Sequence, residues 1–269
     1  MHKFSRRLLR IGVLTVTIAL AWSAQAATFT QATLKGSYGF LTNLWTASAS
    51  TSQFAMVGAL TFDGAGNVTG SFTSITWDTV STGTLGGTYT VNSNGTGSMH
   101  FTTGSKALFS IALNSIVGGV AEGMQLLQTN DKKNEIISGT AVLQSTTTQT
   151  YSLASLKGSF TFQYNPRTVD ASQSEDGGIG IFTFDGKGNV RSSQTIVYGG
   201  TIFKGSGPFL YTVNPDGTGT IEPSGVTGPH IAFALNSVTA GQAEGLQFLD
   251  TNTSDGAGNM VITGTLLKQ

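Results

Sequence analysis

The chain has 269 residues, of which only 10% are charged, and it contains 36 glycines and no cysteine. Its formal charge of zero includes four cations within the first ten residues, so the remainder has 10 cations against 14 anions, a net charge of −4. This balance argues against nucleic acid and anionic membranes as partners, because both require clustered Lys and Arg. The lack of cysteine excludes a disulfide framework and a lipidated N-terminal cysteine.

Residues 1–26 have the pattern of a signal peptide. A basic segment precedes an apolar run from Ile11 to Trp22, and Ala24-Gln25-Ala26 forms a small-residue cleavage site. The apolar run is too short for a permanent membrane span. We therefore expect a mature chain that begins near Ala27 and is exported, to the periplasm or to the extracellular space.

The rest of the sequence is a tandem duplication with an offset of 122 residues. The segment Thr61–Val68 returns as Thr183–Val190, and residues 34–130 match residues 156–252 at 41 of 97 positions without a gap. Two domains of similar structure are expected, over residues 27–147 and 148–269. Each is large enough to be stabilised by its own hydrophobic core.

Each repeat reads as a series of β-strands. Apolar and polar residues alternate from Leu34 to Phe40 and again from Leu156 to Phe162, and Asp-Gly-x-Gly-Asn at 63–67 and 185–189 is typical of a tight hairpin turn. Residues 46–53 and 168–177 are expected to be loops. No segment after the leader shows a helical period. In the first repeat the expected strands are about 34–40, one ending at 62, one starting at 67, 85–92, 96–102, 107–114, 120–128 and 135–144.

Eight short strands joined by short turns favour closure, because a closed sheet has no unpaired edges. The predicted fold class is therefore all-β, with two tandem antiparallel eight-stranded up-and-down barrels joined near residues 145–153. A pair of β-sandwiches is the first alternative. A single 16-stranded outer-membrane barrel is a second, although it requires aromatic girdles that the pattern does not show.

Two resemblances accompany this pattern. Gly36-Ser37-Tyr38 and Gly158-Ser159-Phe160 resemble the Gly-x-Trp that opens lipocalin-type barrels, without the Trp. The succession Leu-x-Gly-x-aromatic-x-Phe, Thr-Phe-Asp-Gly-x-Gly-Asn, Tyr-Thr-Val and Ala-Leu-Asn-Ser resembles uncharacterised secreted bacterial β-repeat proteins. This second resemblance implies export and a barrel similar in outline to lipocalin or allene-oxide-cyclase barrels, and it brings no established activity.

Metal and cofactor chemistry find little support in the sequence. Asp63, Asp185 and Asp255 each supply one carboxylate to a glycine turn, whereas calcium requires six to eight oxygen ligands. His100 and His230 are not equivalent in the two repeats, and no His or Cys cluster is present. We expect no metal and no cofactor.

The candidate site residues are polar side chains that both repeats retain. Strict alternation in the strand 120–128 would place Glu122 on the apolar face with Met124 and Leu126, where a carboxylate must be paired or protonated. The predicted set forms the polar floor or rim of a binding cavity and consists of Glu122, Gln125 and Asn114 with their counterparts Glu244, Gln247 and Asn236. Alternatively, Gly123 and Gly245 mark a bulge that turns each Glu outward, or each Glu is buried for structure alone.

Trp45 and Trp77 occur in the first repeat only, where the second repeat has Arg167 and Gly199. They are candidates for a stacking platform, and packing in the core or rim is the alternative. The sequence thus favours an exported, non-enzymatic binding or surface-interaction protein. Its partner would be a small apolar molecule, a glycan or a surface protein. The alternatives are an isomerase-like or cyclase-like enzyme that uses Glu122 or Glu244 in a barrel cavity, and a purely structural envelope or matrix component.

Overall fold

The structure is a computed structural model that describes residues 28–46, 54–76, 79–130, 135–147, 149–168, 177–198, 200–225, 230–251 and 260–269. The expected leader, Trp77 and the third Asp-Gly-x-Gly-Asn turn lie outside these residues. None of the described helices is long and apolar enough to span a membrane.

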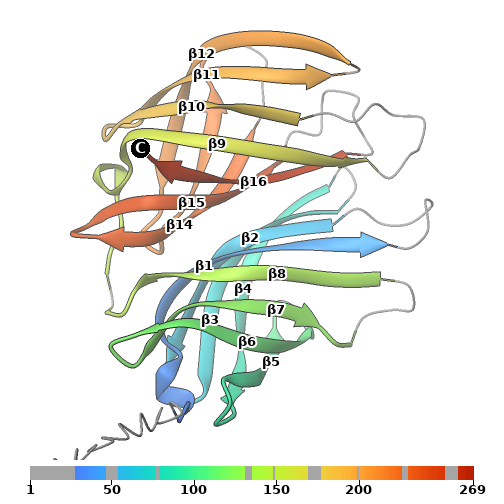
Figure 1. The fold of residues 1–269 in the computed structure, drawn as a ribbon, viewed down its shortest axis with the longest axis vertical. Helices are drawn as coiled ribbons and strands as arrows, with labels where there is room; N and C mark the ends of the chain where they lie inside the picture. The colour runs from blue at the N-terminus through green and yellow to red at the C-terminus, as the bar shows by residue number, and fades with distance from the viewer. Residues whose placement is uncertain are drawn as a thin grey trace, which may run out of the picture.

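The described strands form two closed antiparallel barrels, one above the other in Figure 1. Barrel 1 contains β1 (Lys35–Thr46), β2 (Phe54–Asp63), β3 (Asn67–Thr76), β4 (Thr79–Val91), β5 (Thr96–Thr103), β6 (Leu108–Val117), β7 (Val120–Gln128) and β8 (Glu135–Ser145). Barrel 2 contains β9 (Lys157–Thr168), β10 (Gly177–Asp185), β11 (Asn189–Tyr198), β12 (Thr201–Val213), β13 (Thr218–Pro223), β14 (Ile231–Thr239), β15 (Gln242–Asp250) and β16 (Met260–Lys268).

Each strand pairs with its neighbours in sequence, and the first strand of each barrel pairs with the last, β1 with β8 and β9 with β16. The prediction of two eight-stranded barrels is confirmed. Both alternatives, the sandwiches and the single 16-stranded barrel, are wrong.

Most strand limits lie close to those expected, but β1 runs to Thr46 rather than to about 40. Strand β4 begins at Thr79 rather than near 85, and two short 3-10 turns, η1 (Gln31–Thr33) and η2 (Leu153–Ser155), precede the barrels. The Tyr89 hydroxyl donates to the carbonyl oxygens of Leu34 (2.7 Å) and Gln31 (3.0 Å), which fixes η1 against barrel 1. Tyr211 holds η2 in the same way.

The hairpin turn at 63–67 is stabilised by its own aspartate. Asp63 Oδ1 accepts hydrogen bonds from the backbone N–H groups of Ala65 (2.7 Å) and Asn67 (2.9 Å), and Oδ2 accepts one from Asn67 Nδ2. Gly64 and Gly66 have φ values of 79° and 111°, a region that favours glycine. Asp185 repeats these bonds in barrel 2. The turn geometry therefore accounts for the motif.

Both barrels are filled by side chains. In barrel 1, Phe62 makes edge-to-face contacts with Tyr38 and Tyr89 at centroid distances of 5.4 and 5.1 Å. Barrel 2 repeats this cluster with Phe184, Phe160 and Tyr211. Such contacts add about 0.5–1.5 kcal/mol per pair to the energy of burial.

Candidate functional site

The two barrels pack against each other along a contact that we call the seam. Strands β1, β2 and β8 of barrel 1 meet strands β14, β15 and β16 of barrel 2, as Figure 1 shows at mid-height. A third hydrophobic cluster fills the seam and consists of Leu41, Ala55, Val57, Ile75, Ala232, Ala234, Leu249 and Val261. These side chains point outward from their own barrels and are buried only because the other barrel covers them.

Backbone and side chains approach closely at the seam. A Cβ on Gly39 would lie 2.3 Å from the carbonyl oxygen of Leu235, so only glycine permits this approach of β1 to β14. Gln144 Nε2 donates to the same Leu235 oxygen at 2.9 Å, and Gln247 Nε2 donates to Thr140 Oγ1 at 2.8 Å. The seam thus has the packing and hydrogen bonds of a domain interior.

A groove of about 590 Å³ runs along the seam, and we call it the seam groove. Five of the eight residues predicted from the sequence line it: Asn114, Glu122, Gln125, Asn236 and Gln247. The sequence therefore identified residues that the fold brings together. Their location between the barrels, rather than inside either one, was not expected.

A row of four polar residues crosses the seam beside the groove. Gln125 on β7 pairs with Thr140 on β8, and Gln247 on β15 pairs with Thr265 on β16. The hydrogen bond from Gln247 to Thr140 joins the two pairs across the seam. The result is a continuous row of alternating amide and hydroxyl groups, to which both repeats contribute equivalent residues.

The Asn-Ser segments of both repeats also line the groove. Ser115 and Ser237 have φ values of 49° and 50°, a left-handed conformation that is uncommon for serine. Such strained positions are concentrated at functional sites. Because each serine follows a retained asparagine, the two segments present similar polar groups to the groove.

The retained glycines leave space for the asparagines. Gly123 lies opposite Asn114, and a Cβ on Gly123 would lie 2.7 Å from Asn114 Oδ1. Gly245 has the same relation to Asn236, at 2.5 Å. The pairing of β6 with β7 keeps its register, but Ser115 and Glu122 are left out of it, between the Asn114–Gly123 and Ile116–Ala121 pairs. The strand is thus irregular beside Gly123, and Glu122 turns outward, as the alternative interpretation of Gly123 expected.

Neither retained glutamate points into a barrel. Glu122 is exposed and lines the seam groove, and Glu244 is 43% exposed with Oε1 3.1 Å from Lys268 Nζ. Placement on the apolar face by strict alternation is therefore wrong for both. Ala121 and Met124 flank Glu122, and both are buried although they are three positions apart. The alternation of buried and exposed residues therefore reverses between them.

Two buried amide oxygens at the groove lack a donor among the described residues. Gln144 and Gln247 are 1% and 3% exposed, and Oε1 of each accepts no hydrogen bond. A buried acceptor without a donor costs about 1–3 kcal/mol. A ligand that donates hydrogen bonds would recover that energy once the amide side chains rotate to expose these oxygens to the groove.

The tryptophan candidates remain predictions. Trp45 belongs to β1, but its side chain is outside the described part of the chain, as is the whole of Trp77. The residues that sequence reasoning missed are Thr140, Gln144 and Ser237. Ser237 could have been found, because the Asn-Ser dipeptide occurs at the same position in both repeats. Nothing in the sequence indicated that Thr140 and Gln144 face the second barrel.

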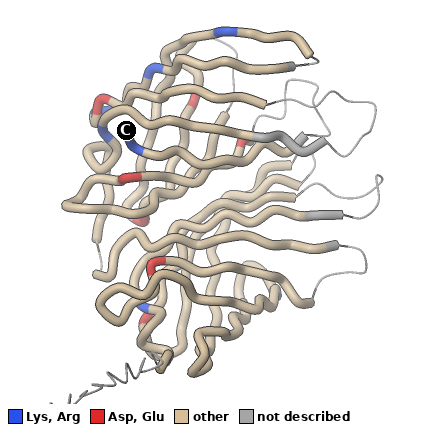
Figure 2. The backbone as a smooth tube through the Cα atoms, viewed as in Figure 1, with Lys and Arg blue, Asp and Glu red and all other residues tan. Residues whose placement is uncertain are grey.

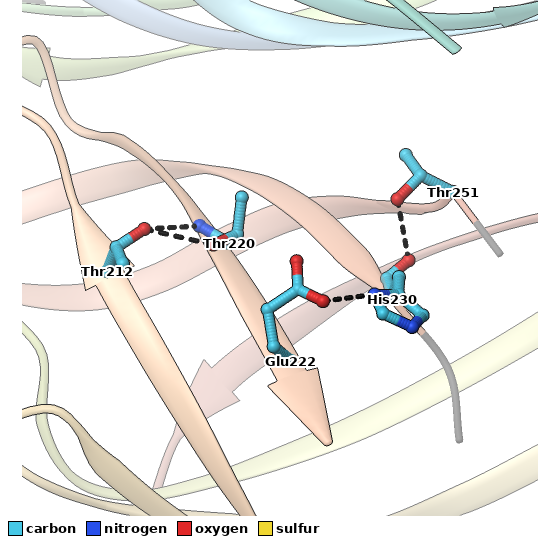
Figure 3. A network of polar contacts seen from close by, with 5 residues as sticks. All are labelled: Thr212, Thr220, Glu222, His230 and Thr251. Atoms are coloured by element: carbon cyan, nitrogen blue, oxygen red, sulfur yellow. Dashed lines mark hydrogen bonds and ion pairs between the residues drawn. The ribbon is translucent and has the colours of Figure 1, made fainter. Parts of the chain in front are cut away.

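A second polar cluster lies at one end of barrel 2 (Figure 3). Glu222 pairs with His230 Nδ1, and Thr251 Oγ1 donates to the His230 carbonyl oxygen at 2.9 Å. Both side chains of this contact are more than 40% exposed. In the described residues, no three His, Cys, Asp or Glu side chains gather to hold a metal ion, so this pair does not form a metal site there.

Comparisons with known proteins give the following results. No protein-family model and no curated protein matches the sequence. A protein of unknown function from the DUF3598 family of Nostoc punctiforme is similar at a TM-score of 0.27 and 13% identity, covering 89% of this chain and 98% of that one. Kievitone hydratase from Nectria haematococca is similar at a TM-score of 0.27 and 8% identity, covering 94% of both chains.

A porin-like protein from Bacteroides uniformis is similar at a TM-score of 0.20 and 9% identity, covering 90% of this chain and 98% of that one. With TM-scores of 0.27 or less, these likenesses assign neither a family nor an activity to the chain.

Proposed function

We propose that the protein is an exported binding protein that holds a neutral, hydroxyl-rich ligand, such as a short glycan, in the seam groove. The observation that carries this proposal is the pair of buried amide oxygens, on Gln144 and Gln247, at a groove of about 590 Å³. Sugar hydroxyls are donors that match such acceptors, and a groove of this volume is within the range of small-molecule sites.

The remaining lining fits the same class of ligand. The described lining residues are mostly amides, hydroxyls and small apolar groups, and Glu122 is the one charged residue among them. Figure 2 shows how sparsely charged residues are placed along the chain. A neutral ligand with many hydroxyls is therefore favoured over an anion, for which the described lining offers no cation. The exposed carboxylate of Glu122 can accept hydrogen bonds from two adjacent hydroxyls.

The barrel-cavity enzyme considered from the sequence requires Glu122 or Glu244 inside a barrel. Glu122 lies at the seam instead, and Glu244 pairs with Lys268. The geometry therefore favours binding at the seam over isomerisation or cyclisation within a barrel.

The duplication supplies a matched pair of variants for a test. Glu122→Gln changes a groove residue, whereas Glu244→Gln changes its counterpart, which is not a lining residue of the groove. Isothermal titration calorimetry with neutral oligosaccharides (glucans, xylans and chitin fragments) measures affinity for both. We expect Glu122→Gln to weaken binding about tenfold, equal to about 1.4 kcal/mol, and Glu244→Gln to leave it unchanged. Absence of binding at millimolar concentrations, or equal effects of the two variants, would contradict the proposal.

A further inference from the structure

The seam joins two non-equivalent surfaces. We call face A the surface of barrel 1 that carries Val57, Ile75 and Thr140, and face B the surface of barrel 2 that carries Leu249, Val261 and Gln247. Because the chain is duplicated, barrel 2 also has its own version of face A, and barrel 1 has its own version of face B. The apolar residues of both versions are exposed among the described residues of the chain.

The uncovered version of face A keeps two of the four apolar residues that barrel 1 places in the seam. Ile179 and Val197 of barrel 2 stand where Val57 and Ile75 stand in barrel 1, at the same register positions of the sheet. Val57 and Ile75 are buried in the seam, whereas Ile179 and Val197 are 58% and 40% exposed. A hollow of about 560 Å³ lies on this surface, lined by Ile179, Ser193, Thr265 and Leu267 among others.

The uncovered version of face B keeps three of its four apolar seam residues, with Ser110 in place of Ala232. Leu127 and Ile136 of barrel 1 stand where Leu249 and Val261 stand in barrel 2. Both counterparts in barrel 2 are buried, whereas Leu127 and Ile136 are 46% and 54% exposed. Ala112 likewise corresponds to Ala234 of the seam cluster.

The hydrogen-bonding groups of the seam are retained too. Gln247 donates a hydrogen bond to Thr140 in the seam. The equivalent positions of the other repeat hold Gln125 and Thr265, and both residues are exposed. Ser71 Oγ donates to Asp216 across the seam, and the corresponding positions are Ser193 and Asn94. A second seam can therefore form with the same types of contact as the first.

We propose that the protein associates with further copies of itself, face B on barrel 1 of one copy packing against face A on barrel 2 of the next. The seam within the chain shows what covers each of these faces, and this identifies a second copy as the partner. Since the two faces differ, the contact is heterologous and generates a ring or an open filament rather than a two-fold dimer. The polar row Gln125–Thr140–Gln247–Thr265 would continue from copy to copy.

The second seam is looser than the first at one strand. Thr161 stands where Gly39 allows the close approach of β1 to β14, and Gln163 replaces Leu41. The next copy must therefore dock with its strand farther from β9, within the hollow. The contact also lacks the effective concentration, on the order of millimolar, that a covalent linker provides. Association is accordingly expected to be weak and dependent on concentration.

Two single variants separate this proposal from other modes of association. Ile179→Lys blocks face A on barrel 2, and Leu127→Lys blocks face B on barrel 1. Neither residue lines the seam groove. Ile202→Lys is the control, because Ile202 is 66% exposed on β12 and belongs to neither face. Circular dichroism and thermal unfolding of each variant establish that it is folded.

Analytical ultracentrifugation from about 10 µM to about 1 mM, a range that reaches the effective concentration above, measures the outcome. The unchanged chain and Ile202→Lys should grow beyond dimers as concentration rises, and each face variant alone should remain monomeric. An equimolar mixture of Ile179→Lys and Leu127→Lys should form dimers only, since one intact face A and one intact face B remain. A monomeric unchanged chain, a mixture that stays monomeric, or equal loss with Ile202→Lys would overturn the proposal.

Discussion

Gly123 and Gly245 illustrate how one residue determines what its neighbour can be. Each leaves the space that an asparagine on the next strand occupies, Asn114 and Asn236 respectively. We expect Gly123→Ala to reduce the free energy of unfolding by about 1–3 kcal/mol, as overpacking does. Chemical denaturation measures this change. Adding Asn114→Ala should recover part of the loss, and additive effects of the two substitutions would contradict the steric explanation.

The buried tyrosines make stability depend on alkaline pH. Burial, and secondarily the nearby Tyr89, raises the pKa of the Tyr38 hydroxyl above its ordinary value of 10.0. The hydroxyl is therefore protonated in the folded state at pH values where it ionises in the unfolded chain. Its contribution to stability is complete below pH 10 and is lost as the pH rises from there toward the folded pKa.

Tyr38→Phe tests this dependence directly. Barrel 2 has Phe160 at the equivalent position, so the ring is tolerated, while the hydrogen bond to the Ala121 carbonyl oxygen (2.6 Å) is lost. We expect a loss of about 1 kcal/mol at neutral pH, measured by urea denaturation. Above pH 10 the stability of Tyr38→Phe should fall less steeply than that of the unchanged chain. Parallel curves for the two proteins would exclude Tyr38 as a source of the alkaline loss.

For individual residues, the sequence predicted which side chains belong to the candidate site, but it did not predict which part of the structure surrounds them. Retention of Asn114, Glu122 and Gln125 in both repeats indicated that they matter, and all three line the seam groove. Strict period-2 alternation gave the wrong direction for Glu122, because the burial pattern reverses between Ala121 and Met124. The alternative, in which Gly123 turns the side chain outward, gave the right one. The choice between these two directions depends on the pairing of β7 with β6, where Ser115 and Glu122 are left unpaired, and the sequence of β7 alone does not contain that pairing.

Among the structural elements, the Asp-Gly-x-Gly-Asn hairpin turns are expected to lose stability at acid pH. Hydrogen bonds from the Asn67 side chain and from the backbone of Asn67 and Ala65 lower the pKa of Asp63 to about 2, and those from Asn189 lower the pKa of Asp185. The pKa of Asp63 is therefore lower in the folded chain than its ordinary value of 3.8. The ionised aspartate stabilises the fold above pH 3.8, and this stabilisation is lost as the pH falls toward 2. We expect the melting temperature to drop through this window. In the double variant Asp63→Asn and Asp185→Asn, thermal scans at several pH values should show a smaller drop, whereas an identical drop would exclude these turns as its source.

The strands and turns were largely predictable, because alternation and turn chemistry are local. The hairpin at 63–67 was expected from five residues, and its hydrogen bonds all lie within those residues. The 3-10 turn at Gln31–Thr33 was not expected, because it depends on the hydroxyl of Tyr89, which lies 58 residues from Gln31. The early start of β4 is a local difference, since Thr79 pairs with Thr76 at the end of the β3–β4 hairpin.

For the molecule as a whole, the close approach at Gly39 holds the barrels together. We expect Gly39→Thr to leave each barrel folded, since barrel 2 carries Thr161 at the equivalent position of β9. The added Cβ would meet the Leu235 carbonyl oxygen and separate the barrels at this point. Differential scanning calorimetry should then show two transitions in place of a single cooperative one. Thr161→Gly serves as the control and should not separate the transitions.

The packing of one barrel on the other could not be read from the sequence. Val57 and Ile179 are the same kind of residue at the same register, yet one is buried and the other is 58% exposed. Repeats of similar sequence give similar surfaces, and the sequence does not say which of these surfaces faces the other barrel. This choice also positions the groove, so its polar residues were predicted as the lining of a barrel cavity and not as one groove between the two barrels.

The pairing of first and last strands has a kinetic consequence. Phe40 lies beside Ala141 in barrel 1, so the sheet cannot close until nearly the whole repeat has been synthesised. Contacts this distant along the chain make folding slow, because the entropy of closing a long loop is lost before any of them forms. Until then β1 presents a free edge on which a foreign strand can add. Chaperones that shield this strand should therefore raise the yield of native protein more than agents acting on any later segment.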